Sequence, residues 1–164
     1  MSRSAANPSC TEAPDAAALR QAFGRFATGV AFVTTSVGHM PHGLLVSSFT
    51  GVSMSPPLVS FCPSRASLTW RRMRATGAFD VHVLAAGHAG FARRVAPAGA
   101  DRFAEPLHDP LAVLSCSIEA EHAAGDHWIV VGRVLDVRVA DGEPLIHFGG
   151  SFRSDPRASA AASG

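Results

Sequence analysis

Apolar and polar positions alternate along most of the chain between residues 30 and 148, as they do in strands that bury one face. Runs rich in β-branched and aromatic residues are separated by glycine, proline and aspartate, which favour turns. Closing such strands into a barrel would remove the exposed edges of the sheet. We therefore expect a mainly β (α+β) fold, an antiparallel Greek-key-like barrel, with six or seven strands at 30–36, 43–53, 58–62, 78–84, 112–122, 127–140 and 144–148.

The same pattern predicts how the long strand 127–140 is oriented and connected. Its apolar residues alternate with polar neighbours and share one face: Ile129, Val131, Leu135 and Val137. Residues 123–126 form a hairpin turn before this strand, and Asp141-Gly142 forms a second hairpin turn after it.

Three segments have helical spacing instead. In the first, which Asp15 can cap and Gly29 ends, apolar residues recur at i, i+3, i+4 and i+7, namely Leu19, Ala22, Phe23 and Phe26. A second helix begins at Ser64 or Ser67 and runs to residue 76, and a short third helix covers 87–95.

Composition narrows the class of protein. The chain has 164 residues, 47% of them hydrophobic, which suits one domain with a core, and its net charge of +1 does not favour binding to nucleic-acid phosphates. No apolar run approaches the ~20 residues of a membrane helix, and no secretory signal occurs near the start. The three cysteines show no disulfide or metal spacing, and Cys62 and Cys116 lie in apolar strands, where we expect buried thiols. We therefore expect a cytoplasmic protein. We divide the chain into a disordered tail at 1–14, a domain at 15–153 and a disordered tail at 154–164.

Small hydroxyl residues gather in the predicted strand 43–53. Their side chains can hydrogen-bond a planar polar ligand without filling the space above it, and Gly51 permits a bulge or a close approach of the backbone. The hydroxyl residues are Ser47, Ser48 and Thr50. An ordinary strand pair with a corner at Pro56-Pro57 explains the same residues equally well.

The start of the predicted second helix carries groups that suit an anion. Free backbone N–H groups, the hydroxyls of Ser64 and Ser67 and the guanidinium of Arg65 converge there. Because a serine at a helix start is more often only a cap, the residues leave both a phosphate site and a plain cap open.

Several common catalytic motifs are absent from the sequence. It has no Walker-type loop, no metal-ligand pair at i, i+4 and no G-x-S-x-G elbow, and its eight histidines do not cluster in ligand spacing. For an enzyme, this absence suggests that a cofactor performs the chemistry, and we expect no metal site.

Eight segments between residues 19 and 153 identify a family by their order and spacing. They include Ser47-Ser48-Phe49, Asp101-Arg102-Phe103 and Gly125-Asp126-His127, and they lie at 23–30, 43–57, 53–59, 67–69, 77–81, 101–103, 125–127 and 142–145. With them the chain resembles the flavin reductase-like family with the FMN-binding split-barrel fold, the reductase components of two-component flavin-dependent monooxygenases. The resemblance implies a homodimer that binds FMN or FAD near the dimer interface, reduces it with NADH or NADPH and supplies it to a partner monooxygenase.

The resemblance also implies roles for particular residues. It places the flavin ring against Val46, Ser47, Ser48, Phe49, Thr50 and Gly51, with Phe152 at the ring edge. It places the flavin phosphate near Ser64, Arg65, Ser67 and Thr69. It makes His127 the catalytic residue beside the nicotinamide, with Arg102 and Phe103 also binding this substrate. Judged without the surrounding motif, Asp126 is only a hairpin residue and His127 a satisfied surface histidine.

Two departures from the family pattern bear on activity. Leu45 stands where the family usually has threonine, which removes a hydroxyl from the flavin side. The loop after Phe103, which the resemblance places over the nicotinamide pocket, is shorter than usual in the family. Its common Gly-x-Pro-Leu segment is reduced to Asp109-Pro110-Leu111. Both features favour an alternative, a flavin carrier or partner subunit without reductase turnover. A third possibility is a relative that uses its bound flavin on an organic substrate.

Overall fold

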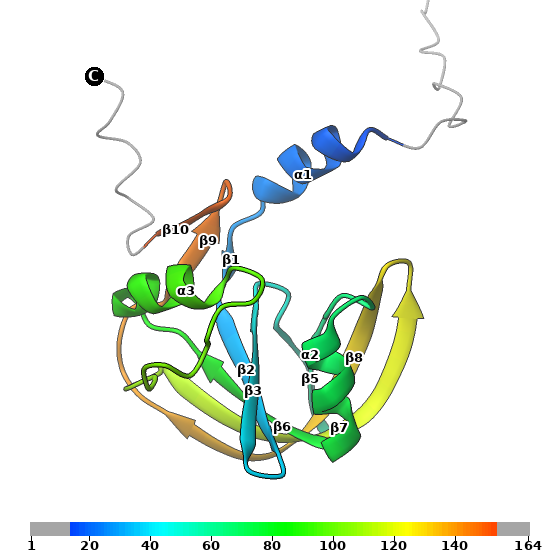
Figure 1. Cartoon of the computed structure of the whole chain (residues 1–164), viewed down its shortest axis with the longest axis vertical. Coiled ribbons are helices and arrows are strands. Elements are labelled where there is room, and N and C mark those ends of the chain that lie inside the picture. Colours follow the sequence, from blue (N-terminus) through cyan, green and yellow to red (C-terminus); the bar gives the residue numbers. More distant parts are fainter. Residues whose placement is uncertain (1–13, 154–164) are drawn as a thin grey trace, which may run out of the picture.

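The computed structural model describes residues 14–153, which form a partly closed barrel with a small second sheet beside it (Figure 1). The larger sheet has seven antiparallel strands in the order β3-β2-β6-β7-β8-β5-β4. These strands are β2 (Ala31–Val37), β3 (Met40–Val46), β4 (Thr50–Met54), β5 (Pro57–Phe61), β6 (Ala78–Val83), β7 (Ala112–Ala124) and β8 (His127–Val139). The mainly antiparallel β fold predicted from the sequence is confirmed. The predicted tails at 1–14 and 154–164 lie outside the described residues, except for Pro14.

The barrel is split between β3 and β4. These strands stand at opposite ends of the strand order, and residues 47–49 carry the chain from one to the other. The prediction of one strand over 43–53 is therefore wrong. The break falls at 47–49, while Gly51 lies at a bulge between Gly51 and Ser53 in the β4–β5 ladder. Because the hydroxyl-rich segment lies between two strands, Ser47 and Ser48 belong to neither ladder.

A small second sheet forms beside the barrel. β9 pairs with β1 on one side and with β10 on the other. The three strands are β1 (Thr28–Gly29), β9 (Ile146–Phe148) and β10 (Ser151–Arg153). The hairpin predicted at Asp141-Gly142 is wrong, because the chain leaves β8 there and enters this second sheet instead of turning back.

Three α-helices and two 3₁₀ turns complete the described structure. They are α1 (Ala16–Gly24), α2 (Leu68–Met73), α3 (Ala89–Val95), η1 (Arg74–Thr76) and η2 (Ala86–His88). Asp15 caps α1 as predicted. The prediction that Gly29 ends this helix is wrong: the helix ends at Gly24, and Gly29 belongs to β1, where it pairs with Ile146. None of the α1 residues is buried, and the helix stands away from the barrel in Figure 1.

Two apolar clusters hold the fold together. The first fills the barrel, where Phe61 packs edge-on against Trp70 of α2 and against Phe79 of β6, each at 5.2 Å between ring centroids. The second lies between the sheet and α3, and its buried members are Val30, Phe32, Leu84, Phe91, Ala92, Val95 and Leu145. The barrel thus has packed side chains inside and a helix against part of its outer surface.

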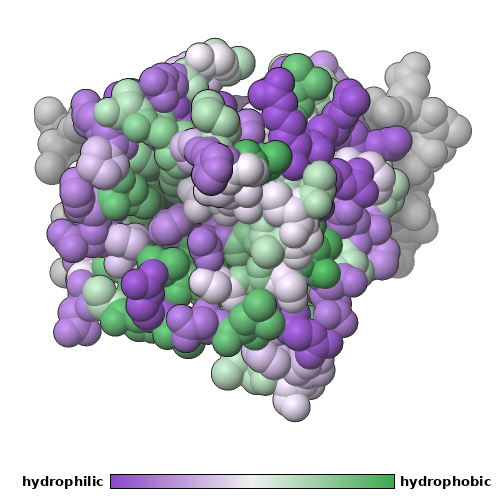
Figure 2. Space-filling model, turned by 60° about the horizontal axis from the view of Figure 1, so that its bottom comes forward, coloured by the Kyte–Doolittle hydropathy of each residue, from purple (hydrophilic) through white to green (hydrophobic). Residues whose placement is uncertain are grey.

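The apolar face predicted for β8 is largely exposed. Of the predicted face, Ile129, Leu135 and Val137 are 39%, 66% and 54% exposed, whereas Val130 is completely buried. Bulges in the β7–β8 ladder shift the register at two points, so simple alternation does not hold along the whole strand. In Figure 2, which brings the lower end of Figure 1 forward, apolar groups form separate patches between polar ones. Within residues 14–153, no helix is long and apolar enough to cross a membrane.

Candidate functional site

A groove of about 650 Å³ opens where the split side of the barrel meets α1 and the β7–β8 hairpin. Its lining residues come from separate parts of the chain: Phe23, Leu44, Leu45, Val46, Ser47, Ser48, Cys62, Pro63, Ser64, Ser67 and His127. A cavity of about 150 Å³ adjoins it and shares Leu45, Val46 and Ser47 with it. The groove therefore combines an apolar wall with several hydroxyl groups and one imidazole.

The segment that crosses between β3 and β4 is fixed by a hydrogen bond. The hydroxyl oxygen of Ser48 accepts the backbone N–H of Cys62 at 2.9 Å, which ties the crossing segment to the end of β5. A serine hydroxyl that accepts a bond can still donate its own proton. Ser47 and Ser48 are both exposed, so each can donate to a ligand in the groove.

The opposite wall of the groove is formed where the chain after β5 runs alongside the start of β8. The backbone N–H of Trp128 donates to the Pro63 carbonyl, and the backbone N–H of Arg65 donates to the Asp126 carbonyl, both at 2.9 Å. An isolated antiparallel bridge between these bonds joins Ser64 and His127. These backbone contacts place the Ser64 hydroxyl and the His127 imidazole on one wall.

The His127 imidazole is oriented by its sequence neighbour. Nδ1 of His127 lies 2.7 Å from Oδ1 of Asp126. Because an ionised carboxylate can only accept, Nδ1 carries the proton of this bond, and Nε2 remains available for a ligand. The hydrogen bond from His127 and the attraction between the two groups lower the pKa of Asp126, which keeps that carboxylate ionised.

The two serines before α2 have local structural partners. Ser67 is the N-cap of α2, as predicted, and its hydroxyl oxygen accepts the N–H of Trp70 at 3.1 Å. The Ser64 hydroxyl oxygen accepts the N–H of Ala66 at 3.2 Å. Both hydroxyl protons are free to be donated into the groove. Thr69 is half-buried in α2 and is not part of the groove lining.

Most of the residues predicted for the flavin site come together, but some do not. Val46, Ser47, Ser48, Ser64 and Ser67 line the groove, and Phe152 lines the adjoining cavity. His127, which was predicted for the nicotinamide, lines the same groove. Phe49 packs against the core of the barrel, and Thr50 and Gly51 belong to β4, where the Thr50 hydroxyl donates to the Gly51 carbonyl at 3.3 Å. The Arg65 guanidinium is turned away to the Gly125 carbonyl, at 3.2 Å.

The predicted substrate-binding residues Arg102 and Phe103 lie apart from the groove lining. Arg102 donates from Nε to the Val95 carbonyl at 3.1 Å and so satisfies the end of α3. The Phe103 ring lies 5.8 Å from that of Phe32 and borders a separate recess of about 380 Å³. The loop that carries both residues therefore packs on the sheet, where Phe103 also lies close to Gly43.

Six residues that line these cavities had no predicted site role, namely Phe23, Val30, Leu44, Cys62, Pro63 and His147. Phe23 was assigned only to a helix face, Cys62 only to a buried thiol, and His147 to no role, yet Phe23 and Cys62 line the groove and His147 the adjoining cavity. Cys62 is half-buried, whereas Cys116 is buried as predicted. Nothing in the local pattern marks Phe23, because its place depends on how α1 lies relative to β3. Across residues 14–153, no group of three or more histidine, cysteine or acidic residues is placed to hold a metal ion.

Known proteins similar to this chain include several flavin reductases. Residues 23–155 match a family model described as flavin reductase like domain. The chain is 35% identical over 153 residues to the reductase subunit HsaB of a flavin-dependent monooxygenase from Rhodococcus jostii (strain RHA1), covering 86% of this chain and 78% of that protein. It is 36% identical over 148 residues to an NADH-dependent flavin reductase from Rhodococcus sp, with 83% and 84% covered.

A solved structure supports the same similarity in three dimensions. The NADH:FAD oxidoreductase of Streptomyces globisporus C-1027, in complex with NAD and FAD fragments, matches this fold with a TM-score of 0.81. The two sequences are 34% identical, and the match covers 88% of this chain and 95% of that one. The split-barrel fold expected from the resemblance is confirmed by this likeness.

Proposed function

The chain belongs to the flavin reductase-like family, and from that premise we propose that it is an NAD(P)H-dependent flavin reductase that supplies reduced FMN or FAD to a partner monooxygenase. The relatives named as NADH-dependent reductases favour NADH as the hydride donor. The observation that carries the proposal is the groove, because it joins an apolar wall, serine hydroxyls and an oriented histidine in one place.

The residues of the groove fit a flavin. Leu44, Leu45 and Pro63 offer apolar surface to a planar aromatic ring, and the Ser47 and Ser48 hydroxyls can donate to the polar edge of such a ring. Leu45 keeps this wall apolar at the position where the family usually carries a hydroxyl. The ring therefore receives packing from Leu45 and hydrogen bonds from the crossing segment next to it.

The protein's part in catalysis is to bind and orient. When bound, a flavin would supply the redox chemistry, as the acceptor of the hydride that the reduced nicotinamide donates. His127 presents Nε2 to the nicotinamide, and Asp126 fixes the imidazole in the required tautomer. Holding two reactants at near-attack distance is enough for a large acceleration, so no protein acid or base is needed.

The end of the groove that carries Ser64 and Ser67 suits the flavin phosphate. Ser64 and Ser67 both line the groove, and both have a hydroxyl proton to donate. Hydrogen bonds to a charged phosphate are stronger than neutral ones. We assign these two serines to the phosphate and leave Thr69, which is absent from the lining, without a role there.

The functional unit is a homodimer. Apolar surface that a single chain leaves exposed supports this assignment. Phe23 in α1 and Phe26 just after it are 71% and 76% exposed, and the apolar side chains near the end of β8 are also exposed. Since Phe23 also lines the groove, a second chain that covers α1 would lie next to the flavin. Sedimentation should show a dimer at micromolar concentration, and a stable flavin-binding monomer would contradict the assignment.

The setting of this reaction is the cytoplasm. Both cysteines in the described part of the chain are free thiols, which suits a reducing compartment. The partner that receives the reduced flavin is a flavin-dependent monooxygenase, as the relative that is the reductase subunit of such an enzyme supports.

A steady-state assay of NADH oxidation with added FMN, FAD and riboflavin tests the proposed function. The protein should accelerate NADH oxidation well beyond the rate of free flavin. Tight flavin binding without acceleration would favour the alternative of a flavin carrier, for which Leu45 in the groove wall is the specific observation.

A further inference from the structure

The end of the β7–β8 hairpin lies beyond the packed barrel, yet it carries His127. Residues 122–127 are all exposed, so the apolar core does not hold them. Their backbone is attached along one edge by the contacts of residues 63–65 with 126–128. These backbone contacts hold one edge of the hairpin end, and side-chain contacts on the face toward α2 are a second set that holds the segment carrying His127.

Glu121 is the acidic group on that face. Its side chain is only 15% exposed, and its two oxygens have different partners on α2 and just after it. Oε1 accepts the indole N–H of Trp70 at 3.0 Å, and Oε2 accepts from Nη2 of Arg74 at 2.6 Å. Trp70 is a core residue of the barrel, so Glu121 connects the hairpin directly to the core.

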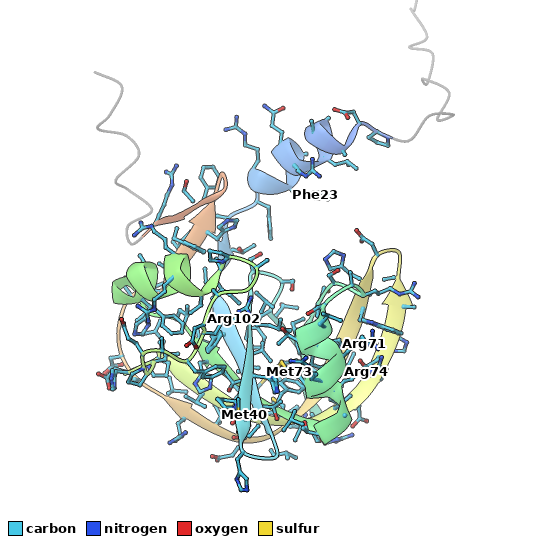
Figure 3. The ribbon with its side chains drawn as sticks, in the orientation of Figure 1. Phe23, Met40, Arg71, Met73, Arg74 and Arg102 are labelled. Atoms are coloured by element: carbon cyan, nitrogen blue, oxygen red, sulfur yellow. The ribbon has the colours of Figure 1, made fainter. Side chains whose placement is uncertain are left out.

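Trp128 adds a second set of contacts next to Glu121. Glu121 pairs with Val130 and Ala123 with Trp128, so both side chains point to the same face of the hairpin. The guanidinium of Arg74 lies 4.8 Å from the centre of the Trp128 ring, and that of Arg65 lies 5.4 Å from it. Figure 3 shows Arg74 on the side of α2 that faces β7 and β8, and Met73 on the opposite side.

The carboxylate of Glu121 offsets the positive charge of the arginines in this cluster. Two guanidinium groups share one indole ring, and like charges so close together repel. Segment 65–74 also holds Arg71 and Arg72 and no acidic residue. The carboxylate of Glu121 is the group that contacts one of these cations, so its charge allows both arginines to stay on Trp128.

We propose that Glu121 is a positioning residue for the pyridine nucleotide. By pairing with Arg74 and Trp70 it holds the hairpin end against α2, and so keeps His127 beside Ser64 on one wall of the groove. The inference rests on the proposed function, because it assigns to His127 the nicotinamide contact described above. In this role Glu121 touches neither flavin nor nicotinamide and acts on NADH binding only through the hairpin.

The hairpin contains a matched control. Glu119, two residues earlier on β7, forms a bidentate pair with Arg133, with both N–O distances at 2.9 Å. In the part of the chain that the structure describes, this pair makes no hydrogen bond to the Trp70–Trp128 cluster, and neither of its residues lines the groove. Glu119→Gln and Glu121→Gln therefore remove the same charge from the same strand, but only the second change reaches the contacts that hold His127.

The test is a double-substitution cycle on NADH kinetics. Glu121→Gln should raise the KM for NADH about fivefold, with kcat and the Kd for flavin changed less than about twofold, since it misplaces one substrate contact. In a His127→Ala background the same substitution should change that KM less than about twofold, because the two residues act through one contact. Glu119→Gln should leave the KM unchanged in both backgrounds.

Intrinsic fluorescence checks that the cluster itself has changed. The chain has two tryptophans, Trp70 and Trp128, and both contact this cluster, so the emission of the whole protein reports on it. Glu121→Gln should shift the emission maximum, and Glu119→Gln should not.

Three results would overturn the inference. An unchanged KM in Glu121→Gln, an equal rise in the wild-type and His127→Ala backgrounds, or parallel losses of flavin affinity and thermal stability would each show that Glu121 does not act through His127. If the wild-type protein fails to oxidise NADH with any flavin, the proposed function fails and this inference fails with it. A working wild type with an unaffected Glu121→Gln variant overturns the inference alone.

Discussion

The interior of the barrel and the groove at its split side differ in how far the chain itself packs or hydrogen-bonds their side chains. Inside, Phe61, Trp70 and Val130 are packed on all sides by residues of the same chain. In the groove, Ser47 and Ser48 keep free donors, and Phe23 is mostly exposed. One chain completes its own core but leaves the groove for other molecules.

That difference separates residues that determine stability from residues that determine binding. Burial of apolar area is the main source of folding free energy, so changes inside the barrel should act on stability first. Most groups in the groove contribute little to folding because they are exposed or partly exposed. Ser67 is an exception, because its hydroxyl caps α2. Changes there should act on flavin or NADH with little loss of stability, and the following substitutions test this separation.

The largest effect is expected from Phe61→Ala. The ring is completely buried between Trp70 and Phe79, and its removal leaves a cavity that the barrel cannot fill. We expect a loss of about 3–5 kcal/mol in the free energy of unfolding, measured by urea denaturation. Met54→Ala, on the exposed end of β4, should change it by less than about 0.5 kcal/mol. Equal losses for the two variants would contradict the description of the barrel interior.

His127→Ala should act on the second region alone. Removing the imidazole should raise the KM for NADH and slow hydride transfer by about ten- to a hundredfold, because one reactant is no longer held in place. Flavin affinity and the melting temperature should change little, since the side chain is half-exposed. A variant that loses flavin but keeps its turnover at saturating flavin would place His127 in the flavin site instead.

Ser67→Ala should produce an intermediate effect on binding. Loss of one charge-assisted hydrogen bond should weaken FMN about tenfold and riboflavin hardly at all, since riboflavin has no phosphate. Loss of the N-cap should also cost about 1 kcal/mol of stability. Ser67→Asp keeps a cap acceptor but adds a charge that repels phosphate, so it should restore stability and weaken FMN further. Equal losses of affinity for FMN and riboflavin would place the phosphate elsewhere.

The smallest effect concerns stability at high pH. Burial, with a contribution from the charge of Asp80, raises the pKa of the Cys116 thiol from 9.0 to about 11. In the unfolded chain the thiol ionises at its lower ordinary pKa, so the stabilisation is complete below pH 9 and is lost as the pH rises toward 11. The chain has no lysine and no tyrosine to obscure this decline.

Substitution of Cys116 identifies the source of that decline. Cys116→Ala should remove most of the fall in unfolding free energy between pH 9 and 11. A decline that persists in Cys116→Ala would mean that another group causes it.

The sequence predicted the barrel better than it predicted the groove. Strands such as β6 follow the alternation of their residues, because neighbours in sequence decide which face is buried. Contacts between distant segments follow no such rule: the break at 47–49 depends on where β3 and β4 pair, and the exposed face of β8 depends on two bulges. Phe23 enters the groove only because of the direction in which α1 leaves the barrel.

The resemblance supplied site residues that local patterns could not, and their placement in the structure is mixed. Ser47, Ser48 and His127 share the groove as expected. Arg102 and Phe103 do not, because Arg102 is bonded to the end of α3 and Phe103 packs on Phe32. A motif fixes which residues occur together in sequence, but the contacts of each side chain in this fold decide what it can reach.

The most direct measurement of the central claim is single-turnover reduction of bound flavin by NADH under anaerobic conditions. With protein in excess over flavin, absorbance of the oxidised flavin should disappear far faster than in a mixture of free flavin and NADH, and His127→Ala should slow this step by about ten- to a hundredfold. A rate equal to that of the free reagents, with flavin shown to be bound, would contradict the assignment of the groove as a site of hydride transfer.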